Sequence, residues 1–75
     1  MDYRAMLVEL VARAERHVAQ GEEHLERQRR VVAERQRQGL DDNEAKDLVI
    51  RLEQSQAAHL ARRDQLRKEL GLSTG

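Results

Sequence analysis

Two rows of mostly apolar residues follow alternating spacings of four and three along this chain, with a few polar residues in the same rows. In the first half, the row consists of Leu7, Val11, Ala14, Val18, Gly21, Leu25, Gln28 and Val32. In the second half, it consists of Ala45, Val49, Leu52, Gln56, His59, Arg63, Leu66 and Leu70. Because this spacing places residues on one side of an α-helix, the pattern predicts two amphipathic helices that pack against each other.

Capping signals indicate where the first helix begins and ends. Asp2 is a suitable N-cap for a helix over residues 3–38, and no proline interrupts that range. Gly39 suits the left-handed position that commonly follows a helix, and Leu40 can pack back on the last turn. The sequence therefore predicts a turn at residues 39–41.

The second helix is expected over residues 42–70. Asp41 and Glu44 have the spacing of a capping box, in which each side chain bonds the backbone near the other. Gly71 and Leu72 repeat the stop signal of the first helix, leaving 71–75 as a frayed tail. Because the connection is so short, the expected fold is an all-α, antiparallel two-helix hairpin forming one domain over residues 1–75.

A chain of 75 residues has a marginal core, so a second subunit is expected to complete it. Pairing about the turn lets Leu70 reach only Leu10, so residues 3–8 should extend beyond the second helix. That overhang predicts a head-to-tail dimer, a four-helix bundle in which this apolar segment lies beside the partner's turn. The expected interface residues are Tyr3, Met6, Leu7, Leu10, Val11, Val18, Gly21, Leu25, Val32, Leu48, Leu52, His59, Leu66 and Leu70.

Three histidines lie on the apolar side of the predicted helices. The same pairing places His59 opposite Gly21, so the glycine is expected to provide the space that an imidazole fills. His17, His24 and His59 could bind a metal, but they match no known zinc spacing, and no metal site or other cofactor is predicted. The favoured interpretation is a structural polar layer, in which imidazoles bond to Gln56, Gln28 or water and protonation would place like charges together.

Composition narrows the possible functions. Fourteen basic and fourteen acidic residues cancel, Tyr3 is the sole aromatic residue of the Phe, Trp and Tyr types, and there is no cysteine. Nucleic-acid binding is therefore not the favoured function, although two arginine-rich stretches, residues 27–37 and 62–68, keep a small RNA-binding dimer as an alternative. No catalytic motif stands out, so the chain is not expected to be an enzyme.

The function predicted from these features is protein–protein interaction or scaffolding through helix self-association. A subunit that pairs with a different protein is a second alternative. No apolar run is long enough to span a membrane and no signal peptide is recognisable, so a cytoplasmic protein without membrane contact is expected.

Two segments carry a resemblance to a family. The segments are ERHVAQGEEHLERQR, residues 15–29, and EQSQAAHLARRDQL, residues 53–66. Together they resemble short, uncharacterised bacterial proteins that pair an H-x-x-x-G-x-x-H segment with an S-Q-x-x-H segment. The resemblance implies no activity. It implies that one group of residues belongs together: His17, Gly21, His24, Ser55, Gln56 and His59.

Overall fold

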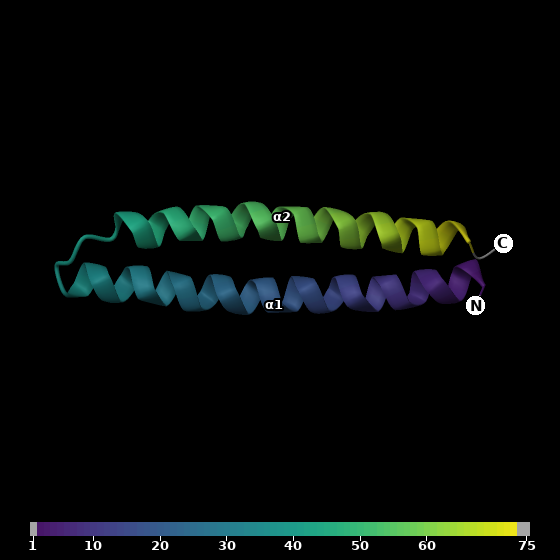
Figure 1. Cartoon of the computed structure of the whole chain (residues 1–75), viewed down its shortest axis with the longest axis horizontal. Coiled ribbons are helices and arrows are strands. Elements are labelled where there is room, and N and C mark those ends of the chain that lie inside the picture. Colours follow the sequence, from purple (N-terminus) through teal and green to yellow (C-terminus); the bar gives the residue numbers. More distant parts are fainter. Residues whose placement is uncertain (1, 74–75) are drawn as a thin grey trace.

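The fold is an antiparallel pair of helices. The computed structural model describes residues 2–73, in which α1 (Tyr3–Arg37) and α2 (Asn43–Leu72) pack side by side along their length (Figure 1). The molecule is a rod measuring 58 × 14 × 14 Å. The start of α1 lies beside the end of α2 at what we call the open end, and the connection forms the turn end (Figure 1). The all-α hairpin predicted from the apolar spacing is confirmed.

Both ends of α1 use the predicted capping residues, although the helix ends one residue earlier than expected. The Asp2 side chain accepts a hydrogen bond from the Ala5 N–H at 2.7 Å. At the other end Gly39 has a φ of 68°. The Leu40 N–H donates to the Arg35 carbonyl at 2.9 Å and the Gly39 N–H to the Gln36 carbonyl at 3.2 Å. These two bonds form a Schellman motif, which a left-handed glycine stabilises.

The start of α2 differs from the predicted capping box by one residue. Asp42, rather than Asp41, is the N-cap, and Asp41 Oδ1 instead accepts from the Asn43 N–H at 3.0 Å. The Asp42 carboxylate accepts from Gln36 Nε2 at 2.8 Å and pairs with Lys46 Nζ at 3.3 Å. The hydrogen bond from Gln36, and then Lys46, lowers the pKa of Asp42 below its ordinary value of 3.8. A contact from α1 thus helps to fix where α2 begins.

The predicted stop at Gly71 is wrong. The second helix continues through Gly71 to Leu72, and Ser73 caps it by donating its N–H to the Glu69 carbonyl and its hydroxyl to the Leu70 carbonyl. Glycine is only a permissive residue, and without a left-handed conformation it does not end a helix. The other residues of the expected tail, 74 and 75, lie outside the described residues.

Two differences from the prediction leave α1 without an overhang: α2 extends to Leu72 rather than Leu70, and the helices pair about one turn away from the expected register. Arg4 Nη1 lies 3.5 Å from Ser73 Oγ, so the two helices finish at the same level. Leu7, expected to lie beyond the hairpin, is the most buried large side chain, with 1 % of its surface exposed. It packs with Ala14 and Leu66 in a cluster at the open end. The residues buried along the remaining seam are Leu25, Ala45 and Gln56.

The two glycines at 39 and 71 should respond oppositely to alanine. Gly39→Ala forces a side chain into the left-handed region and should lower the free energy of unfolding by about 1 kcal/mol. At Gly71 an added Cβ meets nothing within 4 Å, so Gly71→Ala should raise that free energy by roughly 0.5 kcal/mol through helix propensity. Urea titrations followed by circular dichroism measure both, and changes of the same sign would contradict these roles.

Candidate functional site

The two helices are in close contact at Gly21, and the side chain that fills the space beside it is Gln56. A Cβ added to Gly21 would lie 1.8 Å from Gln56 Oε1. The Gln56 side chain is buried, and its Nε2 donates to the Val18 carbonyl at 2.8 Å. The prediction that His59 packs into Gly21 is therefore wrong. Gln56 precedes His59 by three positions, so the true pairing of the helices is offset from the predicted one by about one turn.

Gln56 also retains an unsatisfied polar atom. Among residues 2–73, its buried Oε1 has no hydrogen-bond partner and faces the Cα hydrogens of Gly21. A C–H···O contact is weak, so it compensates only partly for the lost hydration of the amide oxygen. A buried polar group of this kind favours one register of the helix pair over others, at some cost in stability.

The three histidines lie along one open groove beside this contact. The rings of His17 and His59 are 5.5 Å apart between centroids and tilted by 50°. His59 Nε2 lies 3.5 Å from Ser55 Oγ. The groove has a volume of about 250 Å³. Its lining consists of His17, Gln20, Gly21, His24, Leu52, Ser55, Gln56 and His59. All six residues that the family resemblance groups together thus line this histidine groove, and Gln20 and Leu52 complete it.

Within the described chain, the imidazoles form no hydrogen bond with Gln56 or Gln28, the two side chains expected as their partners. Both glutamines proposed as their partners bond to backbone carbonyls instead: Gln56 to Val18, and Gln28 to Ala45 at 3.2 Å. Within residues 2–73 no three side chains of the His, Cys, Asp and Glu types are arranged to hold one metal ion. The part of the chain that the structure describes therefore offers no complete metal site.

Arginines without carboxylate partners surround the histidine groove. Arg13 and Arg27 lie one helical turn from His17 and His24, and Arg51 and Arg62 lie one turn from Ser55 and His59. All four side chains are exposed. Across the described chain none of the four forms an ion pair. In addition, no Asp or Glu stands three or four positions from His17, His24, Ser55 or His59.

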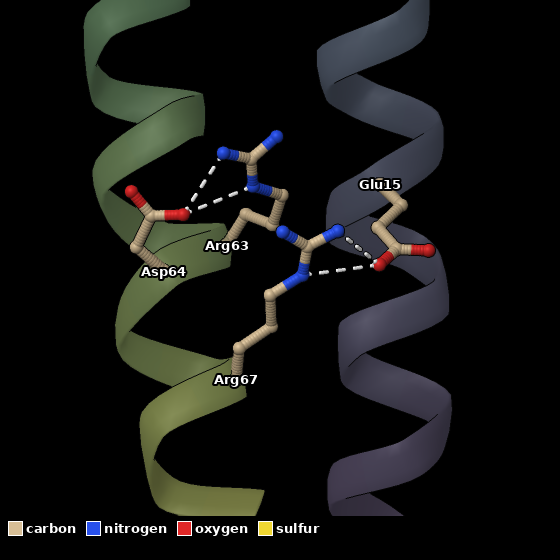
Figure 2. A network of polar contacts seen from close by, with 4 residues as sticks. All are labelled: Glu15, Arg63, Asp64 and Arg67. Carbon is tan, nitrogen blue, oxygen red and sulfur yellow. Dashed lines mark hydrogen bonds and ion pairs between the residues drawn. The ribbon is translucent and has the colours of Figure 1, made fainter.

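On the opposite side of the helix seam, arginines are paired with carboxylates of the other helix. Arg67 of α2 reaches Glu15 of α1 with two hydrogen bonds of 2.7 and 3.2 Å (Figure 2). Arg29 and Glu53 form a second pair between the helices at 3.4 Å. We call this side the salt-bridged side. Within the two arginine-rich stretches, Arg29 and Arg67 are therefore paired on this side, whereas Arg27 and Arg62 lie unpaired beside the groove.

The residues expected at an intermolecular interface fall into three groups. Leu7, Leu25 and Leu66 are buried within the hairpin itself. Tyr3, Met6 and Leu48 are exposed. The remainder are half-buried along the seam: Leu10, Val11, Val18, Gly21, Val32, Leu52, His59 and Leu70.

A second groove lies on the salt-bridged side near the turn. It has a volume of about 320 Å³ and is lined by Arg29, Val32, Lys46, Val49 and Ile50. Sequence reasoning did not identify Ile50, because it lies outside the 4,3 rows. The signal that could have found it is a large apolar residue on the otherwise polar side of an amphipathic helix.

No protein-family model, curated protein or solved structure matches this chain. In residues 2–73, neither helix is both long enough and apolar enough to cross a membrane.

Proposed function

We propose that this chain is a non-enzymatic helix–helix interaction module that self-associates as a dimeric four-helix bundle. The observation that carries the proposal is its surface area of 5655 Å². A monomeric globular protein of 8.7 kDa is expected to expose about 4,700 Å², roughly 900 Å² less. One long side of a 58 × 14 Å rod has a footprint of about 800 Å², the area that each partner typically contributes to a stable interface.

The exposed large apolar residues lie at the two ends of the rod. Those at the open end are Tyr3, Met6, Val8 and Leu72. Those at the turn end are Val31, Leu40, Leu48 and Ile50. A head-to-tail pair related by a twofold axis brings each end beside the other end of its partner, so one contact covers the apolar residues of both ends that lie on the same side of the rod.

The salt-bridged side is the better surface for this contact. Its charges are already neutralised in pairs, and its groove near the turn has Val32, Val49 and Ile50 in the lining. Val8 lies seven residues before Glu15 and therefore on the same side, at the open end, where 48 % of it is exposed. In the head-to-tail pair, Val8 of one copy packs in the groove of the other.

Light scattering after size-exclusion chromatography tests the proposal at micromolar concentration. The intact chain should have the mass of a dimer, and Val8→Glu and Ile50→Glu should each shift it to monomer by burying a charge in the groove. Leu48→Glu is the matched control, because Leu48 is similarly exposed but does not line that groove; it lines a separate one together with Gln28 and Val31. A folded monomer of the intact chain would overturn self-association and favour pairing with a different protein through the same groove.

A further inference from the structure

We propose that the histidine groove binds an extended phosphate polyanion, with the arginines around it as the phosphate contacts. The proposal goes beyond self-association and does not depend on it, since a second copy on the salt-bridged side leaves this groove open. The chain is neutral overall, with fourteen basic and fourteen acidic residues. The lining of the groove nevertheless contains no Asp or Glu. The four arginines beside it form no ion pair within the described chain, whereas Arg67 and Arg29 on the opposite side are paired with carboxylates. Glu9, Glu23 and Asp47 stand one turn from three of the four arginines but, among the described residues, form no ion pair with them.

The chemistry of the groove favours an anion over a metal cation. Its side-chain donors are the imidazoles, the Ser55 hydroxyl and the Gln20 amide, and four guanidinium groups stand within one turn of them. Guanidinium groups bind phosphate through parallel N–H···O bonds, which are short and charge-assisted. The same positive charges repel a divalent cation, so the close approach of His17 and His59 is better suited to donating hydrogen bonds to an anion.

The spacing of the arginines indicates a long ligand. Arg13 and Arg62 flank the level of the neighbouring rings of His17 and His59, and Arg27 and Arg51 flank the level of His24 and Ser55. Fourteen residues separate Arg13 from Arg27, which corresponds to about 21 Å along a helix. A single inorganic phosphate can contact only one end of this array, whereas a nucleic-acid backbone or a linear polyphosphate can follow it from end to end.

The groove also indicates how such a ligand would be recognised. Its lining holds no Phe, Tyr or Trp, so it has no platform on which unpaired bases stack strongly. Arginine contacts to phosphates position a ligand but carry no base information. We therefore expect binding that does not depend on sequence and that falls steeply with salt, and a duplex RNA is the nucleic acid used in the test.

The test measures fluorescence anisotropy of a labelled 20-base-pair RNA duplex with the full chain, at 50 and 200 mM salt. The variants Arg13→Gln/Arg62→Gln and Arg27→Gln/Arg51→Gln should each weaken binding at least tenfold. Each should also reduce the slope of log K against log salt by about 2, close to the value for two lost phosphate contacts. Circular dichroism verifies that the variants, changed only at exposed positions, remain helical.

The matched control is Arg30→Gln/Lys68→Gln. Both side chains are exposed and form no ion pair within the described chain, and neither stands one turn from a residue that lines the groove. The control removes the same net charge and should weaken binding less than threefold. Equal loss in the control and in the groove variants would overturn the proposal, because it would indicate attraction by charge without a site.

Competing polymers distinguish the source of the phosphates. Linear polyphosphate that displaces the duplex, or that binds alone with the same dependence on the four arginines, supports the groove and identifies which polymer it prefers. Binding of poly-L-glutamate without binding of either phosphate polymer would overturn the proposal in favour of an acidic polypeptide. Failure to bind any phosphate polymer at 50 mM salt would also overturn it, whereas a monomeric mass in light scattering would not.

Discussion

Leu7→Ala is expected to lower the free energy of unfolding by about 2.5–4 kcal/mol, the range for a leucine lost from a packed core. Leu7 is 1 % exposed and contacts Ala14 and Leu66, so removing its side chain leaves a cavity between the helices. A pair of helices buries only one row of side chains between them, so few other core contacts can compensate for the loss. Urea unfolding followed by circular dichroism, at one fixed protein concentration, measures the change.

Met6→Ala is the matched control for this effect. Met6 is the preceding residue of the same helix, but 40 % of its surface is exposed, and it lies seven residues before Arg13, away from the salt-bridged side. The substitution should change the free energy of unfolding by less than about 0.5 kcal/mol. Similar losses for Leu7→Ala and Met6→Ala would contradict the packing of α2 against the start of α1. Such a result would restore the overhang expected from the sequence.

Gly21→Ala should lower the free energy of unfolding in the intact chain but raise it when Gln56 is also replaced by alanine. In the intact chain the new Cβ collides with Gln56 Oε1 and displaces an amide that bonds the Val18 carbonyl. The lost packing and hydrogen bond should outweigh the gain in helix propensity, for a net loss of about 1–2 kcal/mol. With Gln56→Ala in place, no collision occurs, and Gly21→Ala should instead stabilise the chain by up to about 1 kcal/mol.

The coupling between these two positions is then about 2–3 kcal/mol, as measured by a double-mutant cycle. Gln54→Ala provides the control background, because Gln54 is an exposed glutamine in the same helix. There, Gly21→Ala should cost as much as it does in the intact chain. If the substitution destabilises all three backgrounds equally, Gln56 does not fill the space beside Gly21.

Sequence reasoning predicted the features that depend on neighbouring residues. The 4,3 rows identified both helices, and Leu7, Leu25 and Leu66 are buried as such rows require. Asp2 and Gly39 were identified correctly, since each combines a residue type with a clear boundary in the apolar pattern. The expected grouping of His17, His24 and His59 also matches their common groove, although the expected hydrogen bonds to glutamine do not form.

Features that depend on how the helices pair were harder to predict. Gln56 and His59 belong to the same 4,3 row, and sliding one helix by a turn preserves that row, so the pattern alone cannot choose between them. Asp41 and Asp42 are equally good caps by residue type, and the choice of Asp42 involves Gln36 on the other helix. The predicted overhang had two sources, the stop assigned to Gly71 and the pairing of Gly21 with His59. The extension of α2 to Leu72 and the shift of the pairing by about one turn together bring the two helix ends level.

The position of the Leu7 cluster affects how the hairpin opens. When the two free ends of a helical hairpin are pulled apart, the helices separate progressively from the open end towards the turn. The cluster of Leu7, Ala14 and Leu66 lies at the open end, so this well-packed contact must break early. Those residues are also the most distant in the chain, so their contact closes last during folding, after the turn has brought the helices together. This cluster therefore holds the open end of the hairpin closed and opposes fraying of the two termini. Once it is broken, few large buried side chains remain along the seam to oppose further separation of the helices.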